Sequence, residues 1–186
     1  MKHLFWSLAL FFCFNHSIAI VRATNKLTRD CEILKGIYDS YKIKNFESNC
    51  CDMENVDCES INSETRMTRL DLSYTNISEI PKNIVNLDEL KKINFSGNNL
   101  NGEIPSFFSQ LPHLEELNLS KNKFYGQIPK SFLDIKNLAL LDISDNRLFG
   151  IIPSDFCDME TLKIIKYHNN MNSVYPSTCI REKFGL

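Results

Sequence analysis

Residues 93–111 read INFSGNNLNGEIPSFFSQL, residues 117–135 read LNLSKNKFYGQIPKSFLDI, and residues 141–159 read LDISDNRLFGIIPSDFCDM. The three stretches carry apolar residues, an Asn, a Gly, an Ile-Pro pair and a Phe at matching offsets. The leading apolar residue recurs at Leu70, Ile93, Leu117, Leu141 and Ile165, at intervals of 23, 24, 24 and 24 residues. Self-similarity at a fixed period of about 20–50 residues is typical of stacked repeat proteins. The sequence therefore predicts an array of five units.

The first half of each unit is expected to be a short strand followed by a turn. Alternation predicts that two apolar side chains point inward and that the residues between them point outward. The inward pairs are Leu70/Leu72, Ile93/Phe95, Leu117/Leu119, Leu141/Ile143 and Ile165/Tyr167. A recurrent Asn follows and can satisfy buried backbone groups where the chain turns, because its amide is both donor and acceptor. This Asn is Asn98, Asn122, Asn146 and Asn170, with Thr75 in its place in the first unit.

The second half of each unit turns the chain back. Gly102, Gly126 and Gly150 allow backbone angles that other residues avoid, and the Ile-Pro pair fixes an extended stretch. Recurrent aromatic residues should then stack as a spine on the far side. These are Phe108, Phe132 and Phe156, with Ile84 in the first unit. Because one unit cannot bury its own apolar face, stacking must form the core and both ends need caps.

The N-terminus has the three parts of a secretory signal. Lys2 and His3 precede eleven mostly apolar residues, LFWSLALFFCF, and Ser17 and Ala19 offer small residues before a cleavage point. We expect a signal peptide over residues 1–19, with cleavage after Ala23 as the alternative. The apolar run is shorter than the roughly 20 residues that a bilayer span requires. No later stretch predicts a membrane helix, so the mature product should be extracellular, at the cell wall or cell surface.

The cysteines lie at the two ends of the mature chain. Cys13 falls in the predicted signal, and the remaining six avoid the central repeats: Cys31, Cys50, Cys51, Cys58, Cys157 and Cys179. An even number in an exported chain indicates disulfides, here placed to fasten end caps. A zinc site is disfavoured, since Cys50 and Cys51 are adjacent and no His lies near them. We expect no metal and no cofactor.

The pattern G-x-I-P, with its N-terminal flank, resembles the plant-type leucine-rich-repeat family. That family includes small extracellular proteins, receptor-like protein ectodomains and polygalacturonase-inhibiting proteins. Its N-terminal cap has an amphipathic helix, then C-C-x-W-x-G-V-x-C, then an Arg before the first strand. Here DCEILKGIYDSYK predicts the helix, residues 50–58 keep the cysteine spacing, and Arg66 precedes the strand. Met53 and Asn55 replace the family's Trp and Gly.

The resemblance implies an α/β leucine-rich-repeat solenoid, a right-handed horseshoe or superhelix with stapled caps. It implies the pairs Cys31–Cys50 and Cys51–Cys58, and leaves Cys157 and Cys179 to close the C-terminal cap. The expected boundaries are 24–66 for the N-terminal cap and 67–170 for the five repeats. A C-terminal cap over 157–186 overlaps the last repeat.

In such a solenoid, function usually lies on the concave face of the strands, here called the strand face. Four outward positions per strand give twenty residues, which is just large enough for a standard protein interface of about 20–30 residues a side. The third outward position of each strand is Ser73, Ser96, Ser120, Ser144 or His168. Leu140 and Ile164 are the preferred contacts, because apolar residues on a polar face often mark a binding site. The candidate partner-binding residues are Arg69, Asp71, Tyr74, Lys92, Glu116, Leu140, Asp142, Ile164, Lys166 and His168.

Three sequons, at Asn76, Asn94 and Asn118, are candidate glycan acceptors in an exported chain. Because Asn-Leu-Ser or Asn-Phe-Ser is also the ordinary sequence of this repeat after its first inward residue, Asn94 and Asn118 could equally be scaffold residues. Used together, these two would crowd the strand face.

The composition gives no sign of an enzyme or a nucleic-acid binder. Net charge is −2 and charged residues make up 24% of the chain, so no basic excess suggests nucleic acid. Asp71 and Asp142 lie three strands apart, about 14 Å by strand spacing, too far for a pair of hydrolytic carboxylates. His168 lacks a nucleophilic partner. We therefore expect a secreted, non-catalytic module that binds a protein or peptide, such as a secreted enzyme or a receptor ectodomain. The alternatives are an inhibitor of a secreted cell-wall hydrolase and a structural or adhesive wall protein.

Overall fold

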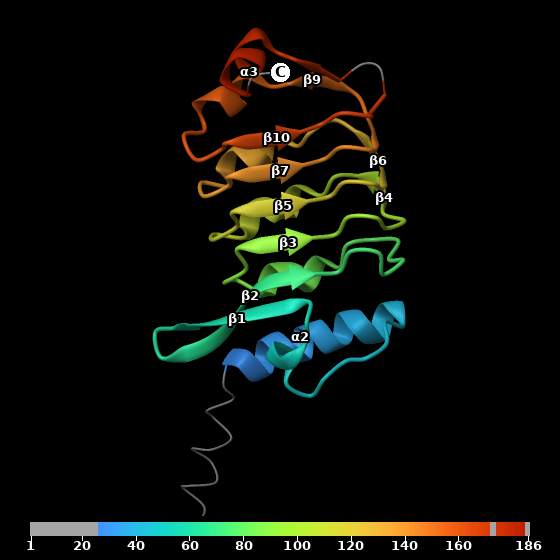
Figure 1. Cartoon of the computed structure of the whole chain (residues 1–186), viewed down its shortest axis with the longest axis vertical. Coiled ribbons are helices and arrows are strands. Elements are labelled where there is room, and N and C mark those ends of the chain that lie inside the picture. The colour runs from blue at the N-terminus through green and yellow to red at the C-terminus, as the bar shows by residue number, and fades with distance from the viewer. Residues whose placement is uncertain (1–25, 172–173, 185–186) are drawn as a thin grey trace, which may run out of the picture.

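In the computed structural model, the recurring apolar segments form parallel strands stacked along one axis (Figure 1). The structure describes residues 26–171 and 174–184, so the predicted signal peptide lies outside the described residues. The strands are β2 (Glu64–Asp71), β3 (Lys92–Asn94), β5 (Glu116–Asn118), β7 (Leu140–Asp142) and β10 (Ile164–Lys166). Leu70, Ile93, Leu117, Leu141 and Ile165 pair in register across them. The α/β repeat architecture expected from the sequence is confirmed.

The inward positions of these strands form the core. Nine of the ten expected inward side chains are at most 3% exposed, and Tyr167 is half-buried against the same core. On the far side, one 3-10 helix in each of the first four units covers the core: η2 (Lys82–Asn86), η3 (Ser106–Gln110), η4 (Lys130–Asp134) and η5 (Ser154–Asp158). Ile84, Phe108, Phe132 and Phe156 are fully buried there. The Phe108 and Phe132 rings meet edge to face at 6.2 Å between centroids, which confirms the spine.

The recurrent Asn side chains hold each unit to the one before it. Asn98 Nδ2 donates to the carbonyls of Leu72 (2.7 Å) and Phe95 (2.9 Å), and its Oδ1 accepts from the amide of Ile77 at 3.2 Å. Asn122, Asn146 and Asn170 repeat this pattern one unit further on each time. Thr75, at the same place in the first unit, donates from Oγ1 to the Leu72 carbonyl at 2.8 Å.

A second sheet runs along the side of the stack, beyond the ends of the main strands (Figure 1). It contains β4 (Asn101–Glu103), β6 (Lys123–Gly126) and β8 (Arg147–Leu148), and β9 (Gly150–Ile152) pairs separately with β11 (Val174–Pro176). The recurrent Gly residues lie in or beside these strands with φ of 106°, 86° and 98°, a region that favours glycine. The sequence predicted extended chain here but not its pairing into sheets.

The N-terminal cap closes the core with a helix and an antiparallel strand. Helix α2 (Lys26–Tyr41) buries Leu34, Ile37 and Tyr38, as its apolar face predicted, and packs on β2. Strand β1 (Val56–Ile61) pairs with β2 through a tight turn at Asn62 and Ser63, both with positive φ. This hairpin was not predicted from the sequence. It covers the open edge of the first repeat strand.

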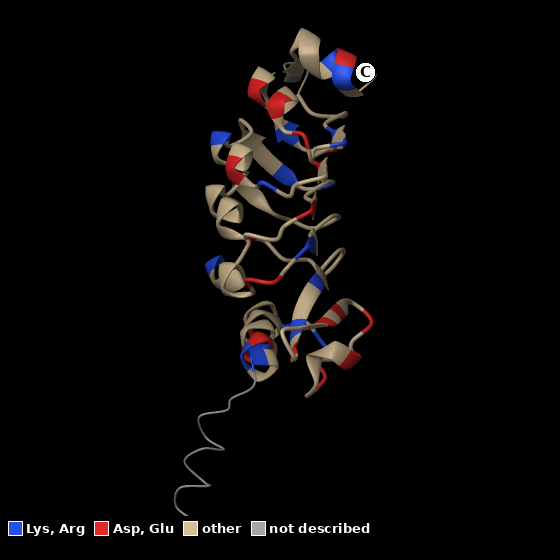
Figure 2. Ribbon diagram, turned by 90° about the vertical axis from the view of Figure 1, so that its left-hand side faces the viewer, with Lys and Arg blue, Asp and Glu red and all other residues tan. Residues whose placement is uncertain are grey.

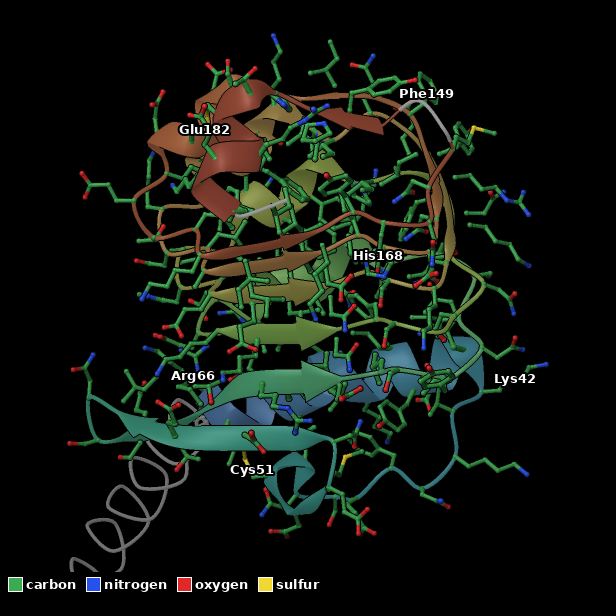
Figure 3. The ribbon with its side chains drawn as sticks, turned by 45° about the horizontal axis from the view of Figure 1, so that its top comes forward. Lys42, Cys51, Arg66, Phe149, His168 and Glu182 are labelled. Atoms are coloured by element: carbon green, nitrogen blue, oxygen red, sulfur yellow. A yellow bond between two sulfur atoms is a disulfide. The ribbon has the colours of Figure 1, made fainter. Side chains whose placement is uncertain are left out.

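All three expected disulfides are present. Cys31–Cys50 joins α2 to the 3-10 helix η1 (Cys50–Asp52), with Cα atoms 5.3 Å apart. Cys51–Cys58 fastens η1 to β1 at 5.7 Å, and Cys157–Cys179 joins η5 to helix α3 (Thr178–Phe184) at 6.3 Å. Figure 3 shows Cys51 and Glu182 at opposite ends of the stack. No helix of the described part is long and apolar enough to cross a membrane.

A buried ionic cluster locks the N-terminal cap to the first repeat. The Arg66 guanidinium is 3% exposed and bonds both oxygens of buried Asp30, at 2.9 and 3.2 Å. It also bonds Asp88 and lies 3.6 Å from Glu89. Burial alone would lower the pKa of Arg66, but the bonds to Asp30 and Asp88 raise it, so the side chain stays charged. The cluster joins α2, β2 and the connection before β3.

Candidate functional site

The strand face carries paired charges at its N-terminal end. Arg69 Nη2 lies 3.2 Å from Asp71 Oδ2, and its Nη1 lies 3.5 Å from Asp57. Asp71 also accepts from the amide of Ser73 at 2.9 Å and from Asn94 Nδ2 at 3.0 Å. Burial raises the pKa of Asp71, but these bonds and the Arg69 charge outweigh it and lower the pKa overall. Asp71 is therefore held as a carboxylate within a local network.

The charge pairs continue along the strands. Lys92 Nζ and Glu116 Oε1 lie 2.8 Å apart on neighbouring strands, and Lys166 Nζ lies 3.6 Å from Asp142 Oδ2. The bond to Glu116, together with its charge, raises the pKa of Lys92. Charges of both signs are interspersed along the molecule in Figure 2. Because these charges largely satisfy one another, the strand face presents no single sign to a partner.

Asp142 and three of the Ser residues that were predicted to point outward are buried. Asp142 is 7% exposed, and its Oδ1 accepts from the amide and the hydroxyl of Ser144 at 3.1 and 2.6 Å. Ser96, Ser120 and Ser144, counted as outward positions, are 7%, 6% and 3% exposed. Strict alternation ends after each three-residue strand, because the chain then turns and brings the Ser inward. The accessible strand face is therefore smaller than twenty residues.

The remaining candidates lie at the two margins of this face. Ile164 is 45% exposed and pairs in register with half-buried Leu140, so these two apolar residues are neighbours as predicted. Tyr74 is 69% exposed, and its hydroxyl accepts from Lys121 Nζ at 3.4 Å. His168 Nε2 lies 3.9 Å from Asp145 Oδ2, beyond the end of β10 (Figure 3).

The hollow on the strand face is shallow. It has a volume of ≈ 220 Å³ and is lined by side chains of all five strands, among them Asp71, Lys92, Asn94, Asn118 and Lys166. Small-molecule sites typically measure about 300–1,000 Å³ and are mostly apolar. Among the described residues, no group of three or more His, Cys, Asp or Glu side chains is placed to hold a metal ion. This hollow is therefore smaller than the usual small-molecule site.

The most apolar exposed surface lies on the side sheets and was not predicted from the sequence. Seven large apolar side chains are exposed in the described part, and five of them gather on the C-terminal half of this side. We call these five the lateral strip: Tyr125, Phe149, Ile151, Met171 and Tyr175. Tyr175 pairs with Ile151, and Tyr125 with Arg147. Phe149 lies at this outer side in Figure 3.

A signal for the lateral strip exists in the repeats. The residue before the recurrent Gly changes from Asn101 to Tyr125 and Phe149 along the array. The residue after it changes from Glu103 to Gln127 and Ile151. Both positions point outward, since Asn101 and Glu103 are exposed on either side of half-buried Gly102, and Tyr125 and Gln127 are exposed on either side of buried Gly126. The polar-to-apolar trend could have identified the strip, had the side strands been recognised as an exposed sheet.

Comparison with known proteins places these features in a family. Models of the leucine-rich repeat match residues 65–124 and 137–159. A chain of the BIR3–SERK2 complex from Arabidopsis thaliana is 32% identical, with a TM-score of 0.65 over 74% of this chain and 80% of that one. The BIR2 ectodomain from Arabidopsis thaliana is 26% identical, with a TM-score of 0.67 over 78% and 94% of the two chains.

A larger receptor is also similar over part of its length. The structure of the Arabidopsis receptor kinase HAESA, with the peptide hormone IDA and the co-receptor SERK1, contains a chain that is 27% identical. The similarity covers 77% of this chain and 26% of that one, with a TM-score of 0.66. A search of curated protein sequences gives no match. With its stacked strands, Asn ladder and disulfide-fastened caps, the chain belongs to the plant-type leucine-rich-repeat family.

Proposed function

We propose that this chain is a secreted, non-catalytic module that recognises a protein or peptide through the C-terminal half of its array. The lateral strip carries the proposal, because contiguous exposed aromatic and aliphatic side chains are the usual anchors of protein contacts. Two similar structures support it, since one is the complex of BIR3 with SERK2 and the other holds HAESA with the peptide hormone IDA and the co-receptor SERK1. An extracellular location agrees with the disulfides, which persist in oxidising compartments.

Two surfaces compete for the main contact within this proposal. The strand face offers Leu140 and Ile164 among charge pairs that are already satisfied. The lateral strip offers more exposed apolar area, and the described carboxylates form no ion pair with its neighbours Lys123 and Arg147. Unpaired cations beside aromatic side chains favour a partner with carboxylates and apolar side chains. We therefore expect the lateral strip to contribute more binding free energy than the strand face.

The test compares two double variants with a matched control. The tagged mature protein, residues 24–186, is used to capture partners from the medium and the cell-surface extract of its source. The captured protein is identified and purified, and its dissociation constant is measured. Phe149→Asp/Ile151→Asp should weaken binding at least about tenfold, since anchors cost about 1–2 kcal/mol or more each. Leu140→Asp/Ile164→Asp should weaken it less, and Lys82→Asp/Lys130→Asp, on the helical side, should leave it unchanged.

The outcomes separate the surfaces and test the proposal itself. A stronger effect of the Leu140 and Ile164 changes would place the partner on the strand face. Equal affinity for all three variants would exclude both surfaces of the C-terminal half. Turnover of a captured carbohydrate or peptide by the purified chain would contradict the non-catalytic role.

A further inference from the structure

We propose that Asn76 is the N-glycan acceptor of this chain, that the Tyr74 ring supports its first sugar, and that Asn94 and Asn118 stay unmodified. The proposal rests on the exported location in the proposed function and on no part of the binding surface. All three residues lie in Asn-x-Ser sequons, so the sequence alone treats them alike. The structure separates them by the exposure of each sequon and by the bonds that each amide already forms.

The Asn76 amide is available to carry a sugar. Asn76 is exposed, and its backbone has a positive φ of 63°. Ser78, the hydroxyl-bearing residue of the sequon, is exposed as well. Asn76 Oδ1 accepts from Asn99 Nδ2, which orients the amide. Among the described residues, no hydrogen-bond partner is present for Asn76 Nδ2, the atom that forms the bond to the sugar.

Tyr74, two residues before Asn76 in the chain, offers an exposed aromatic ring as a platform for the sugar. Its ring lies so close to Gly97 that a Cβ there would sit 2.4 Å from Tyr74 Cε1. One part of the ring thus rests on the glycine backbone, and the side chain remains 69% exposed. An exposed aromatic face is suited to the apolar C–H face of a pyranose ring.

Polar groups flank this platform in two neighbouring rows. Lys121 reaches the Tyr74 hydroxyl from two repeats away, at 3.4 Å. In the second row Lys123 Nζ donates to Asn99 Oδ1 at 2.7 Å, and Asn99 in turn holds Asn76. The two rows start two residues apart on the chain, so they run side by side across the same repeats. A sugar on Asn76 would lie among these donors and over the ring.

Asn94 uses both ends of its amide in the fold, and Asn118 uses its amide oxygen. Asn94 donates from Nδ2 to Asp71 Oδ2 and accepts from the amide of Ser96, both at 3.0 Å. Asn118 Oδ1 accepts from the amide and the hydroxyl of Ser120, at 3.0 and 2.7 Å. Ser96 and Ser120, the hydroxyl-bearing residues of these sequons, are 7% and 6% exposed.

The equivalent positions in other repeats show which side-chain group the fold requires where Asn94 and Asn118 lie. Asp71 and Asp142 stand where Asn94 and Asn118 stand, and they accept from Ser73 and Ser144 in the same way. A carboxylate can form this turn but cannot carry an N-glycan. The requirement is therefore an oxygen acceptor, and the Asn-x-Ser pattern at positions 94 and 118 is a by-product. A glycan there would also fill the hollow that both residues line.

The first experiment maps occupied sites on the full chain expressed in a eukaryotic secretory cell. Glycopeptides from the secreted protein are released with an amidase in ¹⁸O water, and the tagged positions are read by mass spectrometry. We expect Asn76 alone to be tagged. Asn76→Gln should remove the entire glycan mass, whereas Asn94→Gln and Asn118→Gln should leave it unchanged.

Each contrary outcome has its own meaning. A secreted chain with bare Asn76, or with a glycan on Asn94 or Asn118, overturns the acceptor assignment and leaves the binding proposal standing. A chain retained in the cytosol overturns both this inference and the proposed export.

A second measurement tests the platform. Asn76→Gln should lower the melting temperature of the secreted protein when Tyr74 is present, and should have little effect in a Tyr74→Ala background. Tyr125→Ala is the control background, because Tyr125 is also an exposed tyrosine but lies on the lateral strip. In that background Asn76→Gln should still lower the melting temperature. The same melting shift in the Tyr74→Ala and Tyr125→Ala backgrounds would exclude a role for the Tyr74 ring.

Discussion

At the scale of single residues, the Asn ladder is the part of the fold that tolerates least change. The Asn122 side chain is 8% exposed and donates to the carbonyls of Phe95, Leu119 and Ser120, at 2.9 to 3.1 Å. Its Oδ1 accepts from the amide of Leu100 at 3.1 Å. Truncation would leave several buried backbone groups without partners, each of which costs about 1–3 kcal/mol.

We therefore expect Asn122→Ala to lower the free energy of unfolding by about 2–4 kcal/mol. Asn101→Ala is the matched control, because that side chain is exposed and should cost no more than about 0.5 kcal/mol. Urea unfolding with intact disulfides measures both. Similar midpoints for the two variants would show that water replaces the Asn122 amide.

The residues that the sequence predicted correctly are those whose environment is set by their own repeat. The inward apolar pairs, the Asn ladder and the Phe spine follow from a pattern repeated along the chain, so each copy supports the others. Ser96, Ser120 and Ser144 were wrongly assigned outward, because the alternation rule was carried past the end of a three-residue strand. There the chain turns, and Asn94, Asn118 and Asp142 hold the following Ser amides.

At the scale of elements, helix α2 contains a glycine whose replacement should stabilise the protein. Gly36 is exposed in the helix interior, and a Cβ added there meets no atom within 4 Å. Gly36→Ala should raise the free energy of unfolding by about 0.5–1 kcal/mol, because glycine loses more backbone freedom on helix formation.

Gly97→Ala should lower the free energy of unfolding, since φ is +67° and Tyr74 occupies the space that the new Cβ would need. Guanidinium midpoints of both variants test this, and a destabilised Gly36→Ala would contradict it.

The ionic cluster around Arg66 makes the N-terminal cap depend on one side chain. Arg66→Met should leave Asp30 as an unpaired buried carboxylate and cost about 3–5 kcal/mol. Arg69→Met removes a more exposed pair with Asp57 and Asp71 and should cost about 0–1 kcal/mol. Thermal unfolding compares the two. Adding Asp30→Leu to Arg66→Met should restore much of the loss, and failure to do so would argue against an electrostatic origin.

The elements that the sequence did not predict depend on contacts between distant residues. Strand β1 has no repeat to support its assignment, and it forms because the Asn62–Ser63 turn folds it onto β2. Arg66 meets Asp30 and Asp88 from 36 and 22 residues away, and no local pattern marks that meeting. Predicting the side sheets requires knowing which of their strands pair and which side chains point outward, and neither follows from a local pattern. For the same reason the lateral strip was missed.

At the scale of the whole molecule, each repeat unit is stabilised by the units beside it, and the two caps cover the core at the ends. In a repeat array each unit contacts mainly the units beside it, so damage at one end need not reach the other. The C-terminal cap depends on Ile180, on bonds from Lys183 to the carbonyls of Cys157 and Met159, and on the Cys157–Cys179 disulfide. The N-terminal cap has two disulfides, a long helix and the Arg66 cluster. The array is therefore more firmly closed at its N-terminal end.

We expect Cys157→Ser/Cys179→Ser to open the C-terminal end selectively. The lost bond closes a segment with a sequence separation of 22, for which chain entropy suggests about 3 kcal/mol. Hydrogen exchange followed by mass spectrometry should show lost protection in β11, α3 and β10, while β3 and β5 remain protected because the Asn ladder and the N-terminal cap still hold them. Cys51→Ser/Cys58→Ser, with a separation of 7, is the control and should affect only β1 and η1. Equal loss of protection in all five repeat strands would mean that the array unfolds as one unit, and that the caps stabilise the middle as much as the ends.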